Sequence, residues 1–214
     1  MREIKEMYEK QDRLNRATCG NDWVKGVCCS KKEINWEEAI LDETAELLNS
    51  TSWKWWKNQI DDPENLRIEL VDLWHFVMSF HMEQAFLFHI VIDYKEVLHL
   101  YEISEPKTIM QLIKSESNSY AYLMNLFGLM KTYEMDLEEL YGIYQAKNWL
   151  NGFRIKNGYA EGTYTKNLPH KSGSNVLVED NRILMSFVRE IGLEAAFLKF
   201  EQVYRENERQ NGNK

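Results

Sequence analysis

Hydrophobic residues recur along most of the chain at intervals of three and four, the spacing of one face of an α-helix. Runs that alternate apolar with polar residues and end in hairpin turns are hard to find. The prolines Pro63, Pro106 and Pro169 all lie where a connection between elements is expected. The pattern therefore predicts an all-α fold, a helical bundle, with helices at 2–17, 35–50, 63–82, 84–103, 108–127, 134–152 and 180–207.

Two helix starts and one loop stand out within this pattern. Asn35 can cap the helix that follows it, with Glu38 three residues later as its capping-box partner, and Pro63 suits a first helical turn. Residues 151–175 are rich in Gly, Asn, Lys and Tyr and carry no apolar stripe. A basic loop of this length in an acidic protein is more often functional or mobile than a mere connector.

Composition limits the classes to which the chain can belong. With 214 residues, of which 44% are hydrophobic, we expect a single domain over residues 1–214, with or without two lobes. A net charge of −8 argues against direct binding of duplex nucleic acid. The longest apolar stretch, AFLFHIVIDY, is too short to span a bilayer, and the N-terminus does not resemble a secretory signal. The three cysteines lack the spacing of a zinc site, so we expect reduced thiols in the cytoplasm.

Two predicted helices each carry a pair of acids three residues apart, Glu43 with Glu46 and Glu69 with Asp72. Residues three apart project from one side of a helix, and the apolar periodicity assigns these sides to the interior. A solvated acidic face is the alternative. Because a buried, unpaired carboxylate costs several kcal/mol, inward-facing acids need a neutralising partner, and clustered carboxylates suit a hard cation such as Mg2+.

Two further stretches carry candidate binding residues. Residues 50–58 contain three tryptophans and two lysines, and form either a buried aromatic loop or a wall for a base with cations for phosphate. Lys147, Asn151 and Arg154 share the last turns of a predicted helix, as a polar surface or as a nucleotide clamp. In a clamp, Arg can hold phosphate through two parallel hydrogen bonds, and Asn can both donate to and accept from a pyrimidine edge.

Together these stretches resemble the dimeric, all-α dUTPases, a branch of the MazG-like nucleoside triphosphate pyrophosphatases. The resemblance follows family order over most of the first 166 residues. The segment 84–133 and the C-terminal helix carry no assigned motif. The resemblance implies a bundle with a four-helix metal-binding core, and it rests on QDRLN, EINWEEAILDETAELLNSTSWKWWK, ELVDLWHFVMS and KNWLNGFRIKNGYAEGTYTK.

The resemblance also implies a role for each matching position. Two or more Mg2+ ions would be held by Glu43, Glu46, Glu69 and Asp72, and Glu46 would also orient the attacking water. The implied substrate-binding residues are Gln11 and Asn15 for uracil and sugar, Trp56 and Lys54 from the aromatic stretch, Phe76 against the deoxyribose, Asn151 for uracil, and Lys147, Arg154, Tyr159 and Lys166 for the phosphates.

The implied activity is Mg2+-dependent hydrolysis of dUTP to dUMP and pyrophosphate, which limits uracil incorporation into DNA. We expect dUDP as a second substrate, and a homodimer. Two alternatives remain open: a related pyrophosphatase that prefers dCTP or a modified triphosphate, and a noncatalytic helical interaction module whose acids form a docking face. His75, beside Phe76, is interpreted as a hydrogen-bonded core histidine rather than a metal ligand.

Overall fold

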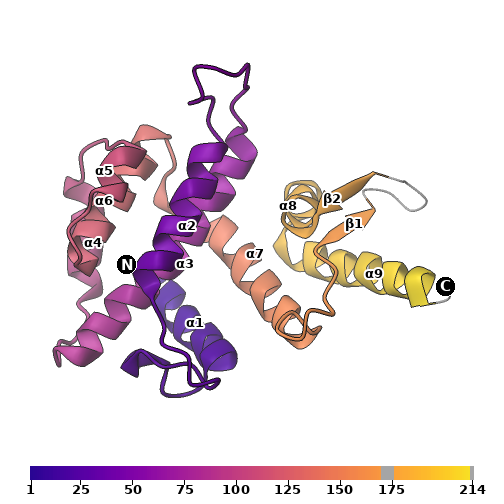
Figure 1. Ribbon diagram of the computed structural model, residues 1–214, viewed down its shortest axis with the longest axis horizontal. Coiled ribbons are helices and arrows are strands. Elements are labelled where there is room, and N and C mark those ends of the chain that lie inside the picture. The colour runs from indigo at the N-terminus through magenta and orange to yellow at the C-terminus, as the bar shows by residue number, and fades with distance from the viewer. Residues whose placement is uncertain (170–175, 213–214) are drawn as a thin grey trace. The chain divides into compact units, whose positions relative to one another are not determined.

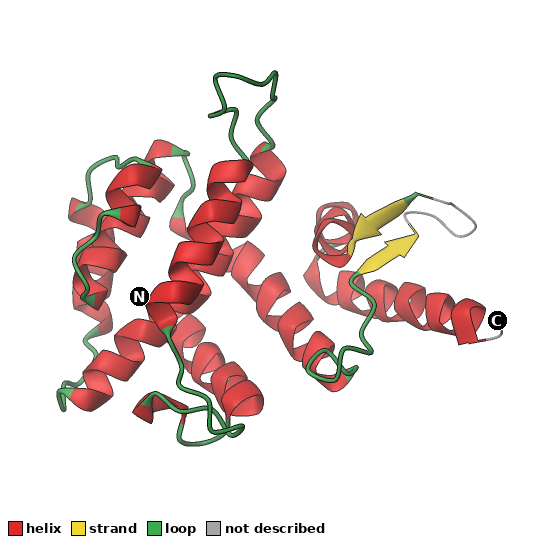
Figure 2. Cartoon of the chain, in the orientation of Figure 1, coloured by secondary structure: helices red, strands yellow, loops and turns green. Residues whose placement is uncertain are grey.

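The computed structural model describes residues 1–169 and 176–212, and most of these residues are helical (Figure 1). The only strands in these two ranges form one short hairpin (Figure 2). The predicted all-α fold is therefore confirmed. The chain divides into two compact units, Met1–Tyr144 and Gln145–Lys214, which are described one at a time.

The first unit is built around one long helix, α3 (Pro63–Leu87). This helix packs against α1 (Arg2–Cys19), α2 (Trp36–Asn49) and α6 (Ser119–Thr132). Trp74 of α3 is fully buried, with the Tyr8 ring centroid at 5.9 Å and the Phe127 centroid at 5.5 Å. A helix that is apolar on most of its circumference belongs inside a core, as α3 does. The unit also contains η1 (Trp23–Lys25), α4 (Tyr94–Ile103), α5 (Ile109–Ile113) and the first turns of α7 (Leu137–Lys156).

The second unit has an aromatic core. It comprises the rest of α7, β1 (Asn167–Pro169), β2 (Leu177–Glu179), α8 (Asp180–Ile191) and α9 (Leu193–Gly212). The strands pair antiparallel, with Asn167 opposite Glu179. Trp149 of α7 stacks on Phe197 of α9 with centroids 4.4 Å apart, and Phe153 meets the edge of Tyr204 at 5.1 Å. These ring contacts join α7 to α9.

The N-cap predicted at Asn35 and the first-turn proline predicted at Pro63 are confirmed. The Asn35 side chain accepts a 3.2 Å hydrogen bond from the Glu38 backbone N–H at the start of α2. Pro63 lies in the first turn of α3, where its missing N–H leaves no intrahelical bond unmade. The N-cap of α3 is Asp62, whose carboxylate accepts from the Asn65 N–H at 3.0 Å.

Three predicted helices have the wrong extent, because local caps interrupt continuous apolar patterns. The predicted helix 84–103 is wrong in its first half: α3 continues to Leu87, and α4 starts only after its cap, Asp93. The predicted helix 108–127 is two helices, since Asn118 caps a new start by accepting from the Ala121 N–H at 2.8 Å. The predicted helix 180–207 breaks at Gly192, whose φ of +80° suits glycine.

The predicted loop 151–175 is shorter than expected. Helix α7 continues to Lys156, and residues 167–169 form β1. The segment between them follows a series of turns, and residues 170–175 lie outside the described residues. Within the described ranges, no helix is both long and apolar enough to cross a membrane.

Candidate functional site

Three of the four predicted metal-ligating acids meet where α2 packs on α3. One carboxylate oxygen from each of Glu43, Glu69 and Asp72 lies within 4.8 Å of the other two. Glu69 is only 5% exposed, whereas Glu43 and Asp72 are half-buried. The structure does not bring Glu46 into this group, and its side chain is exposed. Glu46 lies one turn beyond Glu43 and about 60° around the helix axis, which turns it toward solvent.

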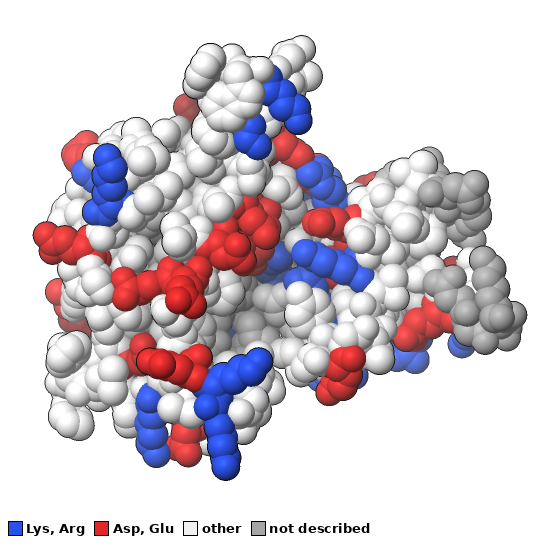
Figure 3. All heavy atoms as spheres, viewed as in Figure 1, with Lys and Arg blue, Asp and Glu red and all other residues white. Residues whose placement is uncertain are grey.

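Acidic side chains are prominent on the visible surface of the first unit, where red spheres form a band (Figure 3).

Glu43, Glu69 and Asp72 are called the acidic group below. Within this group, Glu69 is oriented by Asn65, one turn earlier on α3. The Asn65 amide nitrogen donates to Glu69 Oε1 at 2.8 Å and to Ser50 Oγ at 2.8 Å. Asn65 was not among the predicted site residues, although its spacing of four from Glu69 places it on the same helix face.

The acidic group fits a hard divalent cation. Its donors are all carboxylate oxygens, one of them nearly buried, and like charges this close repel one another unless a cation or protons neutralise them. Mg2+ prefers oxygen ligands of this kind. Glu43, Glu69 and Asp72 can therefore hold Mg2+, with Asn65 orienting one ligand from behind.

Gln11 and Asn15 on α1 belong to a buried polar network. The Gln11 amide nitrogen donates to Asn15 Oδ1 at 2.9 Å and to Ser79 Oγ at 3.1 Å. The Asn15 amide nitrogen donates to the same Ser79 hydroxyl oxygen at 2.9 Å. These three side chains are buried. The structure thus brings together the two residues that the resemblance assigned to uracil and sugar, and adds Ser79, which was not predicted.

The same network includes His75 of α3. Its Nδ1 lies 2.5 Å from Gln11 Oε1, and its ring stacks on Tyr144 with centroids 4.6 Å apart. The Tyr144 hydroxyl donates to Gln11 Oε1 at 3.3 Å and to the Met7 carbonyl oxygen at 2.9 Å. His75 is therefore a hydrogen-bonded core histidine, as predicted. Tyr144 had no recognisable signal in the sequence, because its partners come from α1 and α3.

The aromatic stretch 50–58 is exposed, so the alternative of a buried aromatic loop is wrong. Trp55 is 89% exposed and Trp56 is 58% exposed. The Trp56 ring contacts Trp53 edge-on at 5.3 Å, and Lys54 Nζ donates to Asn49 Oδ1 at 3.3 Å. A solvent-facing indole keeps its ring face available to a flat ligand.

Phe76, predicted to lie against the deoxyribose, is half-buried on α3. Its ring centroid lies 6.2 Å from that of Trp36, at an angle of 38° between the ring planes. Trp36 is the first residue of α2, the helix that carries Glu43. Phe76 therefore packs at the contact between α2 and α3, one turn beyond Asp72.

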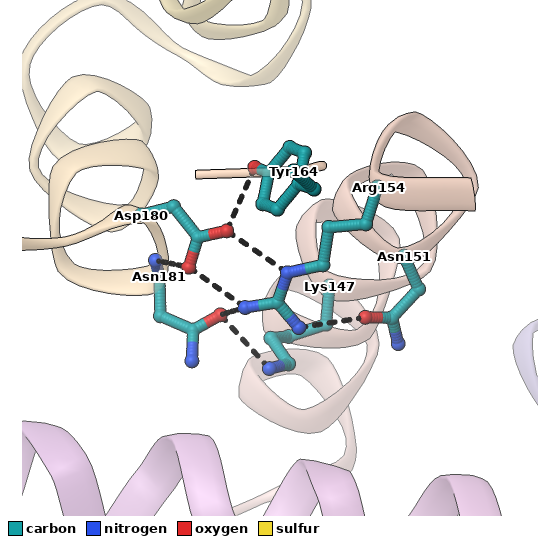
Figure 4. Close-up of polar contacts among 6 residues, drawn as sticks. All are labelled: Lys147, Asn151, Arg154, Tyr164, Asp180 and Asn181. Carbon is teal, nitrogen blue, oxygen red and sulfur yellow. Dashed lines mark hydrogen bonds and ion pairs between the residues drawn. The ribbon is translucent and has the colours of Figure 1, made fainter. Parts of the chain in front are cut away.

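In the second unit, Arg154 of α7 forms a two-bond ion pair that the sequence did not predict (Figure 4). Its Nε donates to Asp180 Oδ2 at 2.9 Å and its Nη2 donates to Asp180 Oδ1 at 2.7 Å. Asp180, the first residue of α8, is 0% exposed. The edge of Arg154 that was predicted to grip phosphate is thus bonded to a buried carboxylate.

The other two predicted clamp residues join this ion pair through amide oxygens. Asn151 Oδ1 accepts from Arg154 Nη1 at 3.1 Å. Asn181 Oδ1 accepts from Lys147 Nζ at 2.9 Å and from Arg154 Nη2 at 3.0 Å. The structure therefore brings Lys147, Asn151 and Arg154 together, as their spacing predicted, and adds Asn181.

Tyr159 and Lys166 flank the same network. Tyr159 is exposed, and its ring centroid lies 5.9 Å from the Arg154 guanidinium carbon. Lys166 is half-buried, and its backbone oxygen accepts from the Asp180 N–H at 2.9 Å. Tyr164 donates its hydroxyl to Asp180 Oδ2 at 2.8 Å. Burial and then the Asp180 charge raise the pKa of Tyr164 well above its ordinary value, which keeps this hydroxyl a donor.

A model of the dUTPase family matches residues 3–159. This range includes Glu43, Glu69 and Asp72, the buried polar network around Gln11, and the chain from α7 to Tyr159. It ends before Lys166 and Asp180. A comparison with curated proteins finds no match.

Proposed function

Because the chain belongs to the dUTPase family and is therefore a dUTP-hydrolysing enzyme, we propose that it requires Mg2+ and releases pyrophosphate and dUMP. The observation that carries this proposal is the convergence of Glu43, Glu69 and Asp72 within 4.8 Å, because carboxylate oxygens in this arrangement are ligands that Mg2+ prefers. Removal of dUTP by this reaction would limit uracil incorporation into DNA.

Glu43, Glu69, Asp72 and, from the next turn of α2, Glu46 are the proposed Mg2+ ligands, for two or more ions per site. When bound, Mg2+ supplies neutralising charge for the phosphate oxygens and lowers the pKa of a coordinated water. Glu46 is the proposed orienter of the attacking water, and its exposure lets water reach its carboxylate. Asn65 holds Glu69 in one orientation through its 2.8 Å hydrogen bond.

The phosphates are proposed to be held by Lys147, Arg154, Tyr159 and Lys166. Tyr159 is exposed and offers a hydroxyl, and Lys166 is partly accessible. Arg154 would act on the phosphates through its positive charge, while its Nε and Nη2 stay bonded to Asp180. Recognition that reaches only the first two phosphates would also accept dUDP, so we propose dUDP as a second substrate.

The base and sugar are proposed to be recognised by short polar and aromatic side chains. Gln11 and Asn15 would contact uracil and sugar, and Phe76 would fill the space that a 2′-hydroxyl needs. Asn151 would read the uracil edge, because an amide can donate to O4 and accept from N3–H. Trp56, with Lys54 beside it, would cover the base with its exposed ring.

We also propose a cytoplasmic homodimer. The last turn of α3 and the connection to α4 expose large apolar side chains that a partner surface would cover, namely Phe86, Leu87, Phe88, Ile90 and Val91. The three cysteines are free thiols, in agreement with a reducing compartment.

The test is pyrophosphate release from each deoxynucleoside triphosphate, with and without Mg2+. We expect dUTP to be cleaved fastest and only with Mg2+. Glu69→Gln removes one charge from the acidic group and should lower kcat/KM by about 100-fold or more. Asp42→Asn is the matched control, because Asp42 is an exposed acid on α2 outside the group, and it should keep about the wild-type rate.

Three outcomes would contradict the proposal. Cleavage of dCTP as fast as dUTP would remove the dUTP preference. Absence of Mg2+-dependent pyrophosphate release from every triphosphate would favour the interaction module. A Glu46→Gln variant with the full wild-type rate would remove the role of Glu46 in orienting water.

A further inference from the structure

The Asn151 side chain is fixed in one of its two amide orientations by Arg154. The guanidinium has only N–H donors, so the Asn151 atom 3.1 Å from Nη1 must be the oxygen. Figure 4 shows the amide nitrogen pointing away from Arg154. That nitrogen makes no hydrogen bond to any residue in the described ranges 1–169 and 176–212.

Arg154 is in turn fixed by Asp180. The carboxylate accepts from Arg154 Nε and Nη2, from the Tyr164 hydroxyl and from the Asn181 backbone N–H, at 2.7 to 2.9 Å. Because Asp180 is fully buried, rotation of Arg154 away from it would leave a buried charge without its partner. The guanidinium is therefore held in one plane, with Nη1 directed at Asn151.

We propose that Asp180 and Arg154 set the preference for uracil over cytosine by fixing the orientation of the Asn151 amide. This inference rests on the proposed function, in which Asn151 reads the base. Asp180 is a positioning residue, since it acts on the base only through Arg154 and Asn151.

The donor and acceptor pattern of the two bases explains the preference. Uracil presents an acceptor at O4 and a donor at N3, which match the Asn151 amide nitrogen and the second lone pair of its oxygen. Cytosine presents a donor at N4 and an acceptor at N3, so it would need the amide reversed. Reversal would place the Asn151 N–H donors against the Arg154 N–H donors, with no acceptor between them.

The test compares kcat/KM for dUTP with kcat/KM for dCTP in wild-type protein and in Asp180→Asn, Arg154→Lys and Tyr164→Phe. Both substrates carry the same triphosphate and sugar, so changes in phosphate binding or in the folded fraction cancel in the ratio. Asp180→Asn replaces one acceptor of the ion pair by a donor and frees the guanidinium. We expect the dUTP to dCTP ratio to fall by about tenfold or more.

Tyr164→Phe is the matched control. It removes one hydrogen bond to Asp180 but leaves both bonds to Arg154, so the ratio should stay within about twofold of wild type. If Asp180→Asn does not fold, Arg154→Lys tests the same connection from Asp180 through Arg154 to Asn151. Lysine keeps a positive charge beside Asp180 but lacks the fork that reaches both Asp180 and Asn151, and it should also lower the ratio.

A folded Asp180→Asn or Arg154→Lys variant that keeps the wild-type ratio would overturn the inference while leaving the proposed function intact. Equal loss of the ratio in Tyr164→Phe would also overturn it, because the effect would then follow from general loosening around Asp180. Wild-type protein that does not hydrolyse dUTP would reject the proposed function, and the inference with it.

Discussion

At the scale of single residues, the three cysteines near the C-terminal end of α1 differ widely in acidity. Burial, followed by hydrogen bonding to Cys28, raises the pKa of Cys19 to about 12. Hydrogen bonding by the Ser30 backbone N–H is the main cause that lowers the pKa of Cys28 to about 7, against the opposing effect of burial. The Cys28 and Cys29 sulfur atoms lie 3.9 Å apart. We therefore expect Cys28 to be the most reactive of the three thiols.

Iodoacetamide should modify Cys28 first. Because its pKa is lowered to about 7, Cys28 should form the reactive thiolate near neutral pH, and its modification rate should rise steeply between about pH 6 and pH 8. Cys19 should stay unmodified through this range, because its pKa lies far above it. Peptide mapping by tandem mass spectrometry distinguishes the adjacent Cys28 and Cys29. Earlier modification of Cys19 would contradict the prediction, and Cys28→Ser serves as the control.

Two buried carboxylates show how far single residues can be predicted from sequence. Glu69 was placed correctly, because leucines at helical spacing surround it and Asp72 follows on the same face. Asp180 was missed, although it is the more buried of the two. Its partners Arg154 and Tyr164 lie 26 and 16 residues away in sequence, so no local pattern links them. Periodicity reveals which face a side chain occupies, but not which distant group meets it.

At the scale of secondary-structure elements, helix α6 is packed tightly against the connection between α4 and α5. A Cβ atom added to Gly128 would lie 2.5 Å from the Glu105 carbonyl oxygen, and so would require this connection to move. The Lys107 N–H donates to the Gly128 carbonyl oxygen at 3.0 Å, which holds the connection in place. Gly142 in α7 is the opposite case, since nothing lies within 4 Å of a Cβ added there.

Alanine should therefore have opposite effects at these two helical glycines. At Gly128 the steric cost of about 1–3 kcal/mol exceeds the gain in helix propensity, so the free energy of unfolding should fall. At Gly142 only the propensity acts, and the free energy of unfolding should rise by about 0.5–1 kcal/mol. Urea unfolding followed by circular dichroism measures both. A Gly128→Ala variant with a higher free energy of unfolding would contradict the prediction, because it would show that the α4–α5 connection can move at little cost.

The extent of the elements was harder to predict than their type. Apolar spacing correctly indicated most of the helices, but the spacing continues across the residues that end one helix and begin the next. Asn118 divides a predicted helix by capping α6, and Gly192 divides another by its positive φ. Both are single residues whose effect depends on backbone conformation, which the apolar pattern does not encode.

At the scale of the whole molecule, the proposed homodimer can be tested by mass in solution. The exposed apolar side chains between α3 and α4 favour association, because they remove apolar surface from water when covered. Sedimentation equilibrium should give twice the chain mass of 25.5 kDa at micromolar concentration. A mass of one chain across the whole concentration range would contradict the proposal.

The exposed loop at residues 50–58 has one more consequence, which is optical. Trp55 and Trp56 face water, whereas Trp23 and Trp74 are sealed inside the first unit. The protein therefore has two classes of indole, and iodide in solution quenches the fluorescence of only the water-facing class. A ligand that binds to the loop should shield Trp55 and Trp56 from iodide. Iodide quenching of the intrinsic tryptophan fluorescence can therefore report ligand binding at this loop without a label.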